Sequence, residues 1–164
     1  MHHPPAARSS EEGASDAPAR LPLPSRRQAP AGARAPSPVR AVRTAGPWTL
    51  PRTLGSCRKA RKELRETLTA WGLEHLVPTA ELLVSELVSN ALRHTDGPLT
   101  LTLERLPGGL RAMVADENPR PPRLVRADID DEGGRGIALV DGLADRWGVE
   151  PEPGGKAVWF ELCG

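Results

Sequence analysis

Apolar residues recur every three or four positions in two neighbouring stretches of the chain, residues 54–71 and 78–95. This spacing places the apolar side chains on one face of a helix and predicts two amphipathic helices in succession. Thr53 or Ser56 is a suitable N-cap for the first helix, because a side-chain hydroxyl can accept a bond from a free backbone N–H. Gly72 follows the last turn of that helix and is expected to end it.

Strict alternation of apolar and polar residues follows the two helices. It predicts two strands joined by a turn at residues 107–109, and hence a β-hairpin. Further along the chain, a shorter apolar helix precedes two more strands, which residues 151–155 join. The predicted strands are 48–50, 99–106, 110–116, 146–150 and 156–162, and the third helix is predicted over 137–143.

The order of these elements, β-α-α-β-β-loop-α-β-β, predicts the fold class. Antiparallel hairpins form a sheet with one apolar face, and the helices supply the apolar stripes that can cover it. We therefore expect an α+β fold, a two-layer sandwich in which helices cover one face of a mostly antiparallel sheet.

The N-terminal segment differs in composition from the rest of the chain. Residues 1–45 are rich in Pro, Ala, Arg and Ser and contain no Phe, Trp or Tyr, so they cannot bury enough apolar surface to offset the entropy of ordering. We expect a disordered tail over residues 1–45 and one domain over residues 46–164. Glu11, Glu12 and Asp16 argue against a transit peptide, and the tail lacks the apolar stretch of a secretory signal.

Charge, hydropathy and cysteine content narrow the function class. The net charge is +1, which gives no global basic field for direct nucleic-acid binding. No stretch approaches the ~18 apolar residues of a membrane span. Cys57 and Cys163 occur without a CxxC pattern, so we expect reduced thiols and neither a disulfide nor a metal site. These features predict a cytoplasmic protein that is not bound to a membrane.

Glu86 and Asn90 are one helical turn apart in residues 81–94 (ELLVSELVSNALRH), so their side chains project from the same face. A helical wheel puts them at the edge of the apolar arc, with His94 inside it, which predicts that they lie at a seam with another element. Oxygen atoms of both can bind a hard cation, and the carboxylate can accept a proton. The alternative is structural: Asn90 and His94 bond loop backbone groups, and Glu86 pairs with Arg93 or a nearby lysine.

Asp116 ends the outgoing strand of the first hairpin. An acceptor fixed at a strand end can take a hydrogen bond from the exocyclic amine of adenine, and a pocket built for that amine would reject guanine. The alternative is a turn in which the Asp116 carboxylate bonds its own backbone.

A glycine-rich stretch, residues 133–136 (GGRG), leads into the third helix. Glycines let backbone N–H groups approach a polyanion, a helix N-terminus favours negative charge, and Arg135 could add a phosphate contact. The alternative is a flexible loop before a helix. The stretch is not a Walker loop, because no Gly-Lys-Ser/Thr follows it, and not a dinucleotide fingerprint, because no parallel βαβ unit surrounds it.

The order and spacing of these features resemble the GHKL ATPase superfamily, whose members share the Bergerat ATP-binding fold. Within it, the chain is similar to the small histidine-kinase-like ATPases of the anti-sigma-factor serine/threonine kinase group. The resemblance covers residues 48–162 and rests on the stretches WTLP, AWGL, ELLVSELVSNALRH, DENP, GGRGIALV and GGKAVWFEL.

The resemblance implies a role for each matching residue. Glu86 would be the general base, Asn90 would hold Mg²⁺, and Asp116 would bind the adenine amine. Residues 117–132 would form a lid over ATP, and Asn118 would shape the adenine end of that lid. The ATP phosphates would lie in the glycine-rich stretch, at Gly134, Arg135, Gly136 and Ile137.

The chain also departs from the superfamily. Many members carry a Thr near the adenine in the last strand, where this chain reads Gly-Lys-Ala-Val at residues 155–158, so we expect no hydroxyl contact there. A phospho-acceptor histidine domain is also missing, since His94 lies in the nucleotide helix and His2 and His3 lie in the tail. This argues against a self-contained sensor histidine kinase.

The function that the resemblance implies is an ATP- and Mg²⁺-dependent serine/threonine protein kinase. It would phosphorylate a small anti-anti-sigma-like antagonist protein and would also sequester a sigma factor. The alternative is a non-catalytic, ATP-dependent switch that controls the binding of a protein partner. The sequence leaves open the partner's identity, the acceptor of the phosphate and the role of the tail. Homodimers are common in the group, but no interface stands out in the sequence.

Overall fold

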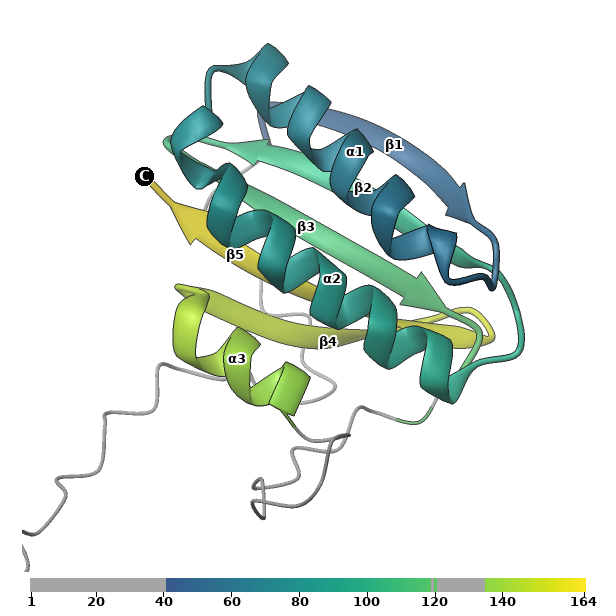
Figure 1. Cartoon of the computed structure of the whole chain (residues 1–164). Coiled ribbons are helices and arrows are strands. Elements are labelled where there is room, and N and C mark those ends of the chain that lie inside the picture. The colour runs from purple at the N-terminus through teal and green to yellow at the C-terminus, as the bar shows by residue number, and fades with distance from the viewer. Residues whose placement is uncertain (1–40, 119, 121–134) are drawn as a thin grey trace, which may run out of the picture.

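The computed structural model describes residues 41–118, 120 and 135–164. In Figure 1 the strands form one sheet, and the helices lie on one face of it. The elements are β1 (Arg43–Leu50), α1 (Gly55–Trp71), the 3₁₀ turn η1 (Glu74–Leu76), α2 (Val77–His94), β2 (Leu99–Leu106), β3 (Gly109–Asp116), α3 (Arg135–Leu143), β4 (Arg146–Glu152) and β5 (Gly155–Cys163). No helix within these described residues is long and apolar enough to span a membrane.

All neighbouring strands of the sheet are antiparallel, and their order is β1-β2-β3-β5-β4. The two predicted hairpins, β2–β3 and β4–β5, are joined because β3 pairs with β5. This confirms the predicted α+β two-layer fold with helices over one face. The central strand is β3, which ends at Asp116.

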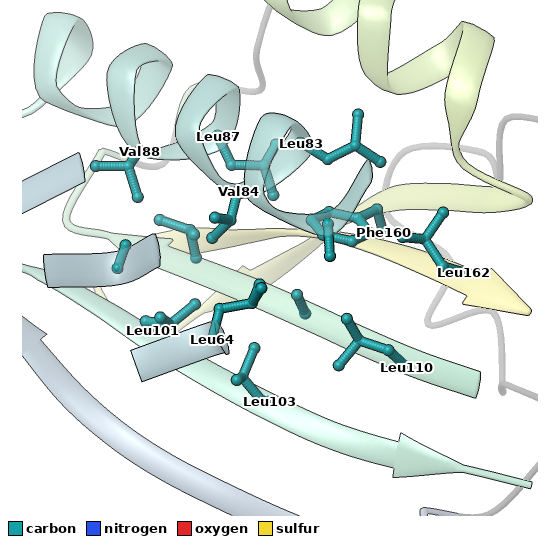
Figure 2. Packing of buried hydrophobic residues seen from close by; sticks show 14 of the residues in the cluster. Leu64, Leu83, Val84, Leu87, Val88, Leu101, Leu103, Leu110, Phe160 and Leu162 are labelled. Carbon is teal, nitrogen blue, oxygen red and sulfur yellow. The ribbon is translucent and has the colours of Figure 1, made fainter. Parts of the chain in front are cut away.

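The core lies between the helices and the sheet, as Figure 2 shows. Burying a large apolar side chain contributes roughly 1.5–3 kcal/mol, so this layer is what holds α2 in place over the sheet. Side chains at most 4% exposed come from three sources: Leu64 from α1; Leu83, Val84, Leu87 and Val88 from α2; and Leu101, Leu103, Leu110, Phe160 and Leu162 from the sheet.

The sequence predicted the C-terminal end of α1 correctly but not its N-cap. The helix begins at Gly55, after Leu54, without a side-chain cap. Ser56 lies inside the first turn, where its N–H bonds the carbonyl of Thr53 at 3.1 Å and its hydroxyl donates to the carbonyl of Pro51. The predicted N-cap is therefore wrong, because the hydroxyl ties the first turn to the preceding loop. Gly72 ends the helix in the left-handed conformation (φ 71°), as predicted.

The first strand is longer than predicted. It begins at Arg43 and not at Trp48, because Arg43 pairs with Arg105 and Ala45 pairs with Leu103 of β2. The register shifts between Ala45 and Trp48. The first three residues of β1 thus belong to the sheet and not to the predicted tail. Residues 1–40 of that tail lie outside the described residues.

The last hairpin is tighter than predicted. Its turn is Pro153–Gly154, with Gly154 at φ 80°, whereas the sequence predicted a loop over residues 151–155. Pro151 pairs with Lys156 in the sheet, so the strands continue almost to the turn. The third helix likewise starts earlier than predicted, at Arg135.

Candidate functional site

Glu86 and Asn90 lie on α2, the helix that packs against α3 on the same face of the sheet (Figure 1). Asn90 is 7% exposed and Glu86 is half-buried. Within the described residues, Glu86 forms no ion pair and the Asn90 side chain forms no hydrogen bond. Arg93, the expected partner of Glu86, donates from Nε to the carbonyl of Ser89 at 3.2 Å. The structural alternative for this pair is therefore not met in the described part of the chain.

Gly136 brings the start of α3 up to the Glu86 carboxylate. A Cβ atom added to Gly136 would lie 2.6 Å from Oε2 of Glu86, closer than real Cβ contacts allow. Only glycine fits at this position without displacing the carboxylate. The predicted seam on α2 is thus found at Glu86, and the element that forms it is α3.

Asp116 is buried at the end of β3, and its two carboxylate oxygens have different environments. Oδ1 accepts from the N–H of Asn118 and from Nζ of Lys156, each at 2.8 Å. Oδ2 is buried and has no hydrogen-bond partner among the residues that the structure describes. The turn expected as the structural alternative is therefore present, but it uses only one oxygen and leaves the other as a free acceptor.

Lys156 is a site residue that the sequence reasoning missed. It is 3% exposed, and besides the bond to Asp116 it donates to the carbonyl of Asn118 at 2.9 Å. In β5 it shares a face with Val158, Phe160 and Leu162, which are buried under the helices. A cation at an inward position of an alternating apolar strand is the signal that could have revealed it.

Asn118 connects the end of β3 to the end of α2. Its Nδ2 donates to the carbonyl of His94, and its Oδ1 accepts from the N–H of Arg120 at 3.0 Å. Asn118 thereby fixes the first residues after β3 against α2. The rest of the predicted lid, residue 119 and residues 121–132, lies outside the described residues.

The glycine-rich stretch is only partly described. Gly133 and Gly134 lie outside the described residues, as does the side chain of Arg135. Ile137 is 4% exposed and belongs to the core. Gly136 and Ile137 are therefore placed at the start of α3 with only their backbone groups available to a ligand.

These residues form one elongated arrangement along α2. Glu86, Asn90 and His94 succeed one another at one-turn intervals, so the first and last are about 12 Å apart along the axis. Gly136 lies at the Glu86 end, and Asn118 lies at the His94 end with Asp116 bonded to it. The arrangement presents a carboxylate at one end and a buried acceptor at the other.

Comparison with known proteins identifies the family. A sequence model of the histidine kinase-like ATPase domain matches residues 50–162. The chain belongs to the histidine kinase-like ATPase domain family. This confirms the resemblance that the sequence motifs indicated.

Two further proteins are similar to this chain. An uncharacterized protein of Streptomyces coelicolor is 46% identical over 70 residues, which are 41% of this chain and 67% of that protein. The crystal structure of the RsbU and RsbW domains of Rv1364c from Mycobacterium tuberculosis matches with a TM-score of 0.54 and 21% identity. That match covers 73% of this chain and 32% of the other, so the chain spans about a third of that protein's length. This likeness shows the fold.

Membership of the histidine kinase-like ATPase family implies ATP binding, and two observations fit that ligand. The unpartnered Oδ2 of Asp116 is an acceptor of the kind that an adenine amine requires. Gly136 has no side chain, so only its backbone lies beside Glu86 at the start of α3. The start of a helix is a place where phosphate binds well.

Few protein atoms of this ATPase domain are available to bind Mg²⁺ directly. Among the described residues, no group of three or more His, Cys, Asp or Glu side chains could hold a metal ion. Asn90 offers a carboxamide oxygen that could join ligand and water oxygens around a hard cation, which is the usual mode for magnesium with nucleotides.

Proposed function

We propose that this chain is an ATP-dependent serine/threonine protein kinase of the anti-sigma type, a cytoplasmic regulatory protein that phosphorylates a small antagonist protein. The observation that carries the proposal is the approach of Gly136 to Glu86. A helix N-terminus attracts phosphate, and a carboxylate beside that phosphate is placed to accept a proton from an attacking hydroxyl.

Asp116 is proposed to bind the adenine. Its Oδ2 would accept a hydrogen bond from the exocyclic amine, while the bonds at Oδ1 keep the carboxylate from rotating. Asn118 would hold the start of the lid against α2 through its bond to His94. The adenine would thus lie at the end of α2 that is furthest from Glu86.

The phosphates are proposed to lie against the start of α3. Backbone N–H groups at Gly134, Arg135, Gly136 and Ile137 would donate to phosphate oxygens, as expected where glycines precede a helix. Asn90 would contribute a carboxamide oxygen to Mg²⁺. The bound ion supplies charge neutralisation for the phosphates.

Glu86 is proposed to act as the general base in the transfer step. It would orient a hydroxyl of the partner protein and take its proton. The hydroxyl oxygen would form a bond to the γ-phosphorus as the bond from that phosphorus to the β,γ-bridging oxygen breaks. The products would be ADP and a phosphorylated serine or threonine.

The partner is proposed to be an anti-anti-sigma-like protein, with a sigma factor as a second partner and a homodimer as the working assembly. The fold likeness to the RsbW domain of the mycobacterial protein supports this choice of partner class. The net charge is +1, so the chain has no large excess of positive charge that would favour a nucleic-acid partner.

The test is transfer of radiolabelled γ-phosphate from Mg·ATP to a candidate antagonist protein encoded in the same genome. Three proteins are compared: the unmodified chain, Glu86→Gln and the control Glu66→Gln, which changes a carboxylate that is 63% exposed on α1. The unmodified chain and the control should transfer phosphate, and Glu86→Gln should be slower by at least about 100-fold.

Two results would overturn the kinase proposal. A rate of transfer by Glu86→Gln equal to that of the unmodified chain would show that Glu86 is not the general base. Tight binding of ATP without transfer to any antagonist or turnover would instead favour the non-catalytic switch. In that case the nucleotide state would be expected to change partner affinity, which a pull-down with ATP and with ADP measures.

A further inference from the structure

Lys156 and Asp116 form a buried ion pair across the neighbouring strands β5 and β3. Nζ of Lys156 lies 2.8 Å from Oδ1 of Asp116, and the two residues are opposite each other in the register of β3 and β5. Their side chains are 3% and 1% exposed. A buried ion pair offsets its desolvation well only when its remaining hydrogen-bonding groups are also used. The unused groups of this pair are therefore informative.

Counting donors and acceptors leaves one of each. The ammonium of Lys156 has three N–H groups, of which one donates to Asp116 and one to the carbonyl of Asn118. The third has no partner among the residues that the structure describes. On Asp116, Oδ1 accepts two bonds and the buried Oδ2 accepts none. The pair thus presents an acceptor and an adjacent donor.

The Watson–Crick edge of adenine carries the complementary groups in adjacent positions, the N6 amine as donor and N1 as acceptor. When the amine lies against Oδ2 of Asp116, N1 is the next group along the edge and meets the free N–H of Lys156. Guanine presents O6 as an acceptor and N1–H as a donor, so each would face a like group. Guanine could satisfy the pair only by shifting along its edge, away from the position that bound phosphates impose.

We infer that Lys156 is a specificity-determining residue of this site, whose ammonium donates a hydrogen bond to N1 of adenine while Asp116 accepts one from the amine. This inference rests on the proposed nucleotide site. It also gives a function to a residue of the stretch 155–158, in which the sequence lacks a threonine.

A purely structural ion pair is the competing explanation. Lys156 would then only join β3 to β5 and hold Asn118 in place. Removing the ammonium would lower the affinity for every nucleotide by the same factor, through the position of Asp116. The identity of ring atom N1 would make no difference to binding.

Calorimetric titration with Mg·ATP and with Mg·1-deaza-ATP distinguishes the two explanations. The analogue keeps the amine but has a C–H in place of N1. The unmodified chain should bind the analogue at least about tenfold more weakly than ATP, the loss expected for a hydrogen bond from a charged donor. Lys156→Met should bind the two nucleotides equally. The control Lys62→Met, which changes a lysine that is 68% exposed on α1, should keep the tenfold ratio.

Each contrary outcome has a distinct meaning. If the unmodified chain binds ATP and 1-deaza-ATP within about twofold of each other, the inference is wrong and the ATP site stands. If Lys156→Met keeps the tenfold ratio, another group contacts N1 and the inference is also wrong. If the unmodified chain binds no Mg·ATP at millimolar concentration, the proposed function fails and the inference fails with it. The comparison of ATP with 1-deaza-ATP on the unmodified chain tests the inference even if Lys156→Met does not fold.

Discussion

Oε2 of Glu86 lies so close to Gly136 that a Cβ atom at residue 136 would come within 2.6 Å of it. Two elements separated by the whole β2–β3 hairpin, α2 and α3, therefore meet at a carboxylate and a glycine. The contact joins the residue expected to accept a proton to the backbone expected to bind phosphate. A substitution at Gly136 therefore tests this contact directly.

Replacing Gly136 with alanine should impair phosphate transfer more than nucleotide binding. The added methyl group displaces the Glu86 carboxylate, and a displacement of about 1 Å can cost on the order of 100-fold in rate. The adenine end, at Asp116, is left unchanged. Initial rates of transfer and ATP affinity, measured on the same preparation, check this prediction.

Gly142→Ala is the matched control, because Gly142 lies in the same helix and its added Cβ would meet nothing within 4 Å. It should transfer phosphate normally and gain up to about 1 kcal/mol in stability from the better helix propensity of alanine. Equal losses of transfer in both variants would mean that the Glu86 contact has no special importance.

Asn90→Ala should remove the dependence of ATP binding on Mg²⁺. The Asn90 carboxamide is the only protein ligand proposed for the ion, and within the described residues it has no competing hydrogen bond. Affinity for ATP is measured with excess Mg²⁺ and with a chelator present. A ratio of the two affinities that equals that of the unmodified chain would exclude Asn90 as a magnesium ligand.

Leu87→Ala should destabilise the fold by about 2–5 kcal/mol, because Leu87 is 1% exposed in the layer between α2 and the sheet. Leu82→Ala, on the same helix, should cost less than about 1 kcal/mol, because Leu82 is 41% exposed. Chemical denaturation of both variants measures the difference. Similar losses at the two positions would contradict the assignment of the buried face of α2.

The periodic elements of this fold could be predicted from sequence because each depends on local spacing. Helix spacing in α2 placed Glu86 at a seam, and alternation in β3 placed Asp116 at a strand end. The wheel also placed His94 inside the apolar arc, yet His94 is exposed. A helical wheel gives the direction of a side chain but not whether another element covers it. The last buried residue of α2 is Ala91, so His94 lies beyond the covered part of the helix.

The contacts between distant segments could not be predicted in this way. The ion pair of Lys156 with Asp116 depends on the register between β3 and β5, which no local pattern specifies. The start of β1 at Arg43 depends on backbone pairing with β2 in a segment whose composition resembles the tail. Both features become visible only when the partner strand is known.

The most direct test of the central claim is calorimetric titration of Mg·ATP into the unmodified chain and into Asp116→Asn. Asp96→Asn serves as the control, since the Asp96 side chain is fully exposed. The unmodified chain and the control should bind ATP with the same affinity, and Asp116→Asn should lose on the order of 2 kcal/mol, about thirtyfold in affinity. Thermal unfolding of each variant confirms that the protein titrated is folded. Unchanged affinity in a folded Asp116→Asn would contradict the assignment of the adenine to Asp116 and the ATP site built on it.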